Sequence, residues 1–138
     1  MTASLATAPP AGSRGIDAIL DEARSRLARV SARRAAEEFA AGAVLVDIRP
    51  VAQREQYGHI PGALLVERNV LEWRFDPRSE ARLPVAGRYD LRVIVFCQQG
   101  YTSSLAAAAL HDIGLHAATD IVGGIEAWVD AGLPHAIG

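Results

Sequence analysis

The chain has 138 residues, half of them apolar, which suits one compact domain with a sizeable core and is too short for two ordinary ones. Fourteen basic residues, all arginine, against 16 acidic ones give a net charge of −2. This balance excludes a global field that would attract nucleic acid or an anionic membrane, and the lack of lysine excludes Schiff-base and P-loop mechanisms.

Residues 1–14 are rich in Ala, Thr, Ser, Pro and Gly, lack the regions of a signal peptide, and are predicted to form a disordered tail. We predict a single domain over residues 15–138. It begins with apolar residues at helical spacing between positions 16 and 30, typical of an amphipathic helix. Ser31 can cap a second helix, which Gly42 ends. No apolar run reaches the eighteen or so residues of a membrane span.

Short apolar runs follow, alternating with helical patterns. The runs cover residues 43–46, 63–66 and 93–96, with a weaker one at 119–122, and the clearest helical patterns cover 103–113 and 124–131. The first two runs have the form of strands buried on both faces. Between Asn69 and Asp90 we expect one short helix and then a loop. Strands alternating with helices predict an α/β fold with a mostly parallel central sheet and helices on both faces.

The single cysteine, Cys97, follows the third run directly. Ligands of open parallel sheets bind beyond the carboxyl ends of strands, and a loop of backbone N–H groups leading into a helix stabilises an anion such as a thiolate. A helix N-terminus also lowers the pKa of a thiol, which favours nucleophilic attack. One cysteine forms no internal disulfide and favours a reducing compartment, so we predict a cytoplasmic protein.

The loop after Cys97 supplies the predicted substrate-binding residues, which are Gln98, Gln99, Gly100, Tyr101, Thr102 and Ser103. Gly100 lets the backbone turn tightly, Tyr101 can form a wall of the pocket, and the two hydroxyl groups can donate hydrogen bonds or cap the helix. The alternative for a lone cysteine after a strand is a buried, inert side chain.

Four segments, in this order and approximate spacing, resemble the rhodanese-like domain. They are Val46-Asp47-Ile48-Arg49, Gly58-His59-Ile60-Pro61-Gly62-Ala63, the Cys97 loop and Gly123-Gly124-Ile125-Glu126-Ala127-Trp128. The resemblance extends from about Ser31 to the C-terminus. It implies a three-layer fold, a persulfide on Cys97, and an active-site loop from Cys97 to Thr102.

The loop departs from two relatives of this pattern. Related phosphatases have a loop one residue longer that ends in arginine, so sulfur chemistry is favoured here. Thiosulfate sulfurtransferases usually carry Cys-Arg-x-Gly-x-Arg or a loop lysine, whereas this loop holds no cation. We therefore expect a dianionic donor to bind less well.

Other residues have two interpretations each. Arg68 and Arg74 either supply the missing charge from outside the loop or are surface arginines, and the second is favoured. Asp47 and Arg49 lie near the site in the family, and we favour a structural ion pair for them. His59 is expected to order its turn instead of acting as a base. The other histidines lack metal-ligand spacing, so we predict no metal and no cofactor.

These features favour a sulfurtransferase or sulfur carrier. Cys97 would take sulfur from a small donor or a persulfide-bearing protein and pass it to a thiol or cyanide acceptor, without nucleic-acid or membrane partners. A binding or redox-sensing module with low turnover is the alternative, motivated by the uncharged loop and by the added helix over residues 16–30. A phosphatase or arsenate reductase ranks last.

Overall fold

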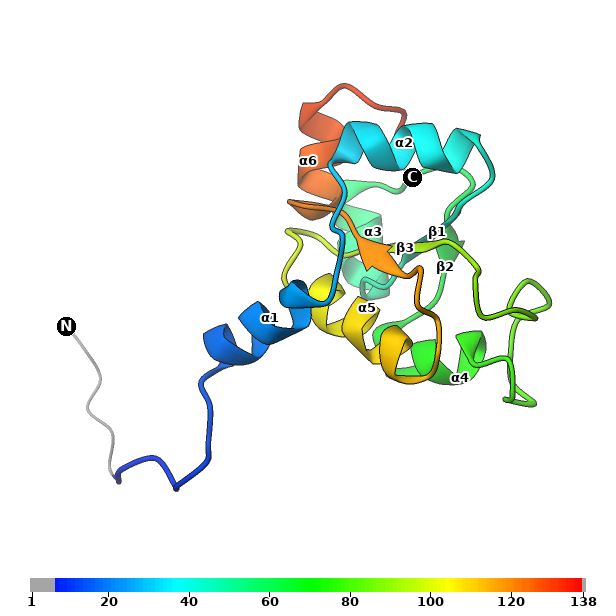
Figure 1. Cartoon of the computed structure of the whole chain (residues 1–138). Coiled ribbons are helices and arrows are strands. Elements are labelled where there is room, and N and C mark those ends of the chain that lie inside the picture. The colour runs from blue at the N-terminus through cyan, green and yellow to red at the C-terminus, as the bar shows by residue number, and fades with distance from the viewer. Residues whose placement is uncertain (1–6, 138) are drawn as a thin grey trace.

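The computed structural model describes residues 7–137 and has an α/β architecture. Four parallel strands form one sheet in the order β2-β1-β3-β4. Figure 1 shows α2 and α6 on one face of this sheet and α1, α4 and α5 on the other. The predicted three-layer fold with a parallel central sheet is confirmed. The strands are β1 (Val44–Asp47), β2 (Leu64–Leu65), β3 (Val93–Phe96) and β4 (Thr119–Asp120).

The helices connect and cover the strands. They are α1 (Ile16–Ser25), α2 (Ala32–Ala40), α3 (Val51–Tyr57), α4 (Leu71–Phe75), α5 (Thr102–Asp112) and α6 (Gly124–Asp130), with a 3₁₀ turn η1 (Arg68–Val70) before α4. The expected cap of α2 forms, since the Ser31 side chain accepts a hydrogen bond from the backbone N–H of Arg34. No helix between residues 7 and 137 is long and apolar enough to cross a bilayer.

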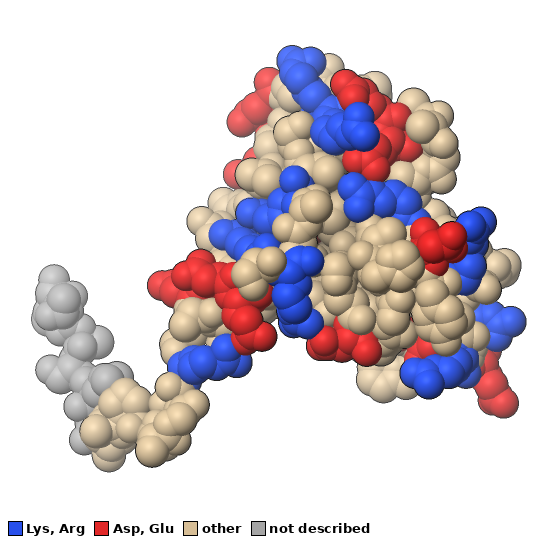
Figure 2. All heavy atoms as spheres, in the orientation of Figure 1, with Lys and Arg blue, Asp and Glu red and all other residues tan. Residues whose placement is uncertain are grey.

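Charged side chains of both signs are interspersed over the face drawn in Figure 2. Several of them pair across α2 and its surroundings. Glu38 accepts hydrogen bonds from Arg92 at 2.8 and 3.2 Å and from Arg34 at 3.2 Å. The mixture of signs on this face agrees with the near-neutral balance of the sequence.

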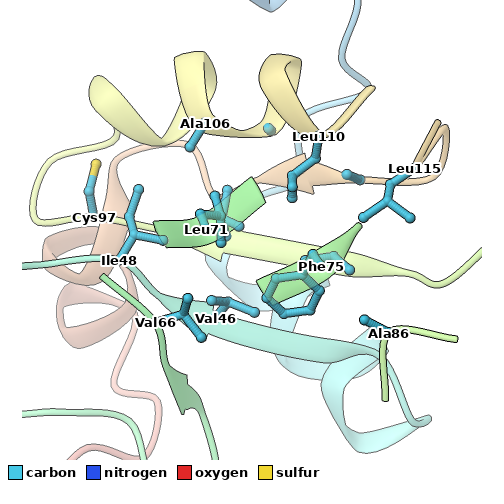
Figure 3. Packing of buried hydrophobic residues seen from close by; sticks show 14 residues of the cluster. Val46, Ile48, Val66, Leu71, Phe75, Ala86, Cys97, Ala106, Leu110 and Leu115 are labelled. Atoms are coloured by element: carbon cyan, nitrogen blue, oxygen red, sulfur yellow. The ribbon is translucent and has the colours of Figure 1, made fainter. Parts of the chain in front are cut away.

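The core lies on both faces of β1 and β3, whose residues alternate between two hydrophobic clusters. Val93 and Val95 join Phe75, Leu110 and other residues of α4 and α5 (Figure 3). Ile94 and Phe96 face the opposite cluster, with residues of α2 and α6. Because every residue of β3 is fully buried, the end of this strand gives Cys97 a rigid support.

The predicted helix over residues 16–30 is wrong at its C-terminal end, because α1 stops at Ser25. Val30 instead lies beside β4 in a parallel bridge with Ile121. Its N–H donates to the Asp120 carbonyl at 3.1 Å, and its own carbonyl accepts from Val122 at 2.9 Å. The side chain of Val30 is buried, so its helix-like spacing reflects burial against the sheet.

The second predicted strand and helix α3 also differ from the sequence analysis, and part of the predicted tail lies outside the described residues. The run over 63–66 forms the two-residue edge strand β2, with Leu64 and Leu65 exposed, not a strand buried on both faces. Helix α3 was not foreseen, because its residues are largely polar and none is buried. Of the predicted tail, residues 1–6 lie outside the described part, and residues 7–14 are exposed without helix or strand.

Candidate active site at the Cys97 loop

Cys97 lies at the carboxyl end of β3 and begins the loop that leads into α5. Its thiol is free and its residue is 6 % exposed. The backbone N–H of Gly100 points at Sγ, with a nitrogen–sulfur distance of 3.2 Å. Cys97 borders an open pocket of about 380 Å³, here called the Cys97 pocket, which is lined by Gln53, Tyr57, Cys97, Gln98, Gln99, Tyr101, Thr102 and Glu126.

The first turn of α6 holds the loop from one side. The N–H groups of Ile125 and Glu126 donate to the carbonyls of Cys97 and Gln98, at 3.0 and 3.2 Å. This approach requires glycine at Gly124, where a Cβ atom would lie 2.5 Å from the Cys97 carbonyl oxygen. The Gly-Gly pair of the last motif therefore allows the backbone of α6 to lie in close contact with the Cys97 loop.

Asp47 and Arg49 form a buried ion pair behind the loop. The Arg49 guanidinium contacts both carboxylate oxygens of Asp47, at 2.8 and 3.0 Å, and donates to the Gly58 carbonyl at 2.7 Å. A fourth hydrogen bond of the guanidinium, at 2.9 Å, goes to Oε1 of Gln98. The pair thus fixes a loop side chain, and the Asp47 carboxylate neutralises the cation.

Gln98 also connects to an acidic residue that the sequence reasoning did not assign to the site. Its Nε2 donates to Oε2 of Glu126 at 3.1 Å. Glu126 is exposed and lines the Cys97 pocket, so a carboxylate contributes to the pocket's charge. The only sequence signal for this role was that Glu126 is the fourth residue of the last motif, Gly123-Gly124-Ile125-Glu126-Ala127-Trp128.

The structure brings Gln98, Gln99, Tyr101 and Thr102 together around the pocket, but not Ser103. Ser103 is fully buried, and its hydroxyl donates to Asp120 at 2.8 Å. The first turn of α5 directs this side chain toward Asp120 of β4 and away from the Cys97 pocket, which argues against the predicted contact with substrate.

Two distant arginines and one histidine have other contacts. Arg68 pairs with Glu72 at 2.7 Å, and Arg74 donates to the Ala81 carbonyl at 2.6 Å. Neither residue lines the Cys97 pocket. The backbone of His59 forms an antiparallel bridge with Ala136. Among residues 7–137, no three His, Cys, Asp or Glu side chains group closely enough to hold a metal ion.

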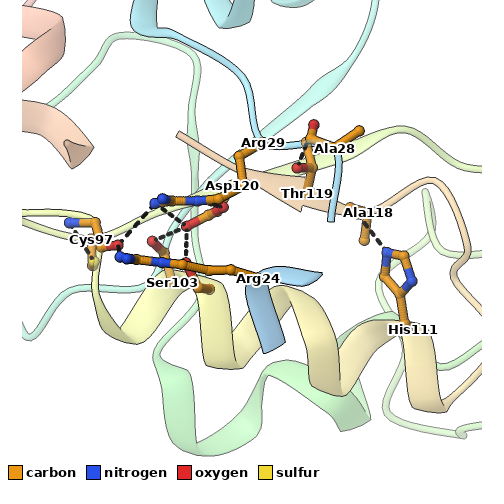
Figure 4. Close-up of polar contacts among 11 residues, drawn as sticks. Arg24, Ala28, Arg29, Cys97, Ser103, His111, Ala118, Thr119 and Asp120 are labelled. Carbon is orange, nitrogen blue, oxygen red and sulfur yellow. Dashed lines mark hydrogen bonds and ion pairs between the residues drawn. The ribbon is translucent and has the colours of Figure 1, made fainter. Parts of the chain in front are cut away.

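The back of the loop contacts a polar network that the sequence reasoning missed (Figure 4). Asp120 is fully buried and accepts hydrogen bonds from Ser103 and Ser104, each at 2.8 Å. Arg29 binds the same carboxylate at 2.9 and 3.2 Å. Both Arg24 and Arg29 donate to the carbonyl of Gly100. No local motif indicates these contacts, and those of the two arginines join residues more than 70 positions apart.

The family model of the rhodanese-like domain matches residues 31–131, a range that includes the whole sheet and the Cys97 loop. The chain belongs to the rhodanese-like family. This rhodanese-like chain is 35 % identical over 89 residues to the adenylyltransferase and sulfurtransferase UBA4 of Candida albicans. It is 34 % identical over 85 residues to the adenylyltransferase and sulfurtransferase MOCS3-1 of Zea mays. The matches cover 63 % and 62 % of this chain but only 19 % and 18 % of those proteins.

Solved structures similar to this rhodanese-like chain include a Rhodopseudomonas palustris CGA009 protein of unknown function, described as a possible tyrosine phosphatase. It has a TM-score of 0.82 and 36 % identity, and the match covers 94 % of this chain and all of that one. The polysulfide-sulfur transferase of Wolinella succinogenes has a TM-score of 0.68 and 18 % identity, covering 88 % and 87 %. This last likeness supports the fold alone. The family and the curated relatives support sulfur transfer at the level of the family.

Proposed function

We propose that this rhodanese-like domain is a sulfurtransferase or sulfur carrier that uses Cys97 as its nucleophile. The observation that carries the proposal is the position of Cys97, which lines an open pocket and has its sulfur 3.2 Å from the Gly100 amide nitrogen. An amide aimed at sulfur stabilises both a thiolate and the persulfide anion formed from it. The same backbone group therefore serves the free and the loaded states.

In the first step of the transfer, one sulfur–sulfur bond forms as another breaks. The Cys97 thiolate attacks the outer sulfur of a donor R–S–SH, a bond forms between the two sulfurs, and R–S⁻ leaves with the electron pair of the broken bond. The proton stays on the transferred sulfur or passes to water. A thiolate or cyanide acceptor then attacks that outer sulfur and releases Cys97 as a thiolate.

The charges around the pocket favour a donor other than thiosulfate. The loop carries no cation, the guanidinium of Arg49 is paired with Asp47, and the Glu126 carboxylate lines the pocket. Each of these features disfavours a dianion. A persulfide on a small thiol or on a protein meets no such penalty, and the aromatic rings of Tyr57 and Tyr101 offer its organic part a surface.

A direct test is the intact mass of the protein after incubation with thiosulfate, mercaptopyruvate, polysulfide or a persulfide-bearing desulfurase. We expect the wild type to gain one sulfur atom that dithiothreitol removes, and the Cys97→Ser variant to gain none. The chain has no other cysteine, so this variant is a complete thiol control. The proposal would be overturned if none of these donors loaded sulfur, or if the protein hydrolysed an aryl phosphate in a reaction that depends on Cys97.

The restricted exposure of Cys97 also favours a second candidate, a binding module with little turnover. In that case a partner captured by the wild type should be captured equally by Cys97→Ser. A sulfur carrier should lose the partner, or lose transfer to it, when the thiol is removed. Comparing capture and transfer for the same partner separates the two functions.

A further inference from the structure

Two arginines from a segment before the family-matched residues converge on the back of the Cys97 loop. Arg24 lies on α1, which packs against α5, and Arg29 lies between α1 and α2. The Gly100 carbonyl accepts a hydrogen bond from Arg24 at 2.8 Å and another from Arg29 at 3.0 Å. Figure 4 shows both side chains reaching toward Cys97 with Asp120 between them. We call these two residues the guanidinium pair.

The two arginines differ in how their charges are balanced. Arg29 makes a two-point ion pair with the fully buried Asp120, so this site as a whole is neutral. Arg24 donates its Nε–H to the Ser104 hydroxyl at 3.1 Å and lies 5.6 Å from the centre of the Tyr101 ring. Within residues 7–137 it makes no ion pair. Arg24 therefore adds a net positive charge to the back of a loop that has none of its own.

The bond geometry links this charge to the sulfur. In a trans peptide the N–H points opposite to the C=O, and no cis peptide occurs in the described chain. The Gly100 carbonyl faces the two guanidinium groups, so the Tyr101 N–H of the same peptide points away from them. A carbonyl bound by two cations is also polarised, which makes the N–H of the same peptide a stronger donor.

We propose that Arg24 and Arg29 are positioning residues for Cys97, and that Arg24 supplies the positive charge that rhodanese-like loops with arginine or lysine carry internally. This inference rests on the proposed role of Cys97 as a nucleophile. The guanidinium pair holds the carbonyl of Gly100, the residue whose own N–H contacts the sulfur, and stabilises the thiolate and the persulfide through this residue. It does so from behind the loop, so the pocket in front remains free of cations.

The test measures alkylation of Cys97 by iodoacetamide, a neutral probe that needs no sulfur donor. Intact mass gives the rate over a range of pH for wild type, Arg24→Gln, Arg24→Lys and Arg26→Gln. Arg26 lies next to α1 and pairs with the exposed Asp112, so it is a matched control for loss of one surface arginine. Arg24 is preferred to Arg29 as the target, because removing Arg29 would leave Asp120 buried without its cation.

We expect Arg24→Gln to slow alkylation at pH 7 about three- to tenfold and to move the pH profile to higher pH. Arg24→Lys keeps the charge and should retain the wild-type profile with a smaller loss of rate, and Arg26→Gln should match wild type. A purely structural role would lower the melting temperature without moving the profile. An Arg24→Gln profile identical to wild type would overturn the inference, as would an Arg24→Lys profile shifted as far as that of Arg24→Gln.

The two proposals fail in different ways. If no donor loads sulfur but the alkylation profile moves, sulfur transfer is wrong and the positioning role stands. If sulfur loads normally and the profile does not move, only the positioning role is wrong. Should Arg24→Gln fail to fold, the profile of the Lys variant decides, because a shift to higher pH in a variant that keeps the charge contradicts the proposal.

Discussion

Gly100 directs its backbone N–H at the sulfur of Cys97 from 3.2 Å, in a conformation with φ of +88°. A Cβ atom at this position would lie 2.8 Å from the backbone nitrogen of Gly123. Both the turn of the loop and its contact with the start of α6 therefore depend on glycine. Backbone atoms therefore set the geometry around the Cys97 sulfur more than side chains do.

The Gly100→Ala variant should lose sulfur loading by about tenfold or more, because the amide moves away from the sulfur. It should also lose about 2 kcal/mol of unfolding free energy in urea. Gly132→Ala is the matched control, since Gly132 has φ of +74° with open space around it. That variant should cost about 1 kcal/mol and load sulfur normally. Equal loading by both variants would contradict this account of the loop.

Replacing the pocket carboxylate should change donor preference. The Glu126→Gln variant keeps the size of the side chain but removes a negative charge beside the loop. We expect kcat/KM with thiosulfate to rise about two- to fivefold at low ionic strength and the gain to shrink in salt. Asp130→Asn, at the other end of α6, should leave the rate unchanged. A thiosulfate rate unaffected by Glu126→Gln would remove the charge argument against that donor.

The buried carboxylate of Asp120 should matter far more for stability than an exposed one. Asp120→Ala leaves Arg29 without its ion-pair partner and two serine hydroxyls without an acceptor, so we expect a loss of about 3–5 kcal/mol. Asp112 pairs with Arg26 at the surface, with 67 % of its side chain exposed. Asp112→Ala should therefore cost less than about 1 kcal/mol. Urea unfolding of both variants measures the difference, and similar losses would contradict the assignment of Asp120 to the core network.

Acid should weaken the ion pair between Glu38 of α2 and Arg92. The hydrogen bond from Arg92 holds the pKa of the Glu38 carboxyl below its ordinary value of 4.5. Because the pKa is lower in the folded state, this stabilisation is fully present above about pH 4.5 and is lost as the pH falls through the folded-state pKa. Wild type should exceed Glu38→Gln by about 1 kcal/mol at pH 7, and the difference should shrink in acid. Urea unfolding from pH 7 to pH 3 measures it, and a difference independent of pH would contradict the prediction.

The central strands and the position of Cys97 were predictable because their signals are local. The Val93–Phe96 run is apolar at every position, as a strand covered on both faces must be, and the residue that follows it is Cys97. The approach of Arg49 to Asp47 was equally local, since two positions separate the residues. An apolar run cannot report whether a strand lies at an edge, and this is why β2 was misjudged.

The contacts that complete the candidate site depend on tertiary packing. Ser103 was assigned to the pocket from its position alone, but the orientation of α5 turns its hydroxyl to Asp120. Arg24 resembles any polar residue of an amphipathic helix until α1 is placed against α5. Periodicity describes which face of a helix is apolar and says nothing about which carbonyl a distant guanidinium reaches.

The parallel bridge between Val30 and Ile121 bears on where a shortened form of this domain should begin. Residues 16–30 precede the segment shared with the family, yet this bridge attaches them beside Asp120, where Arg24 and Arg29 meet the loop. A shortened chain cut at Ser31 would keep the nucleophile and discard the cations behind it. Anyone grafting this module onto another protein should therefore begin at the start of α1, not at the family boundary.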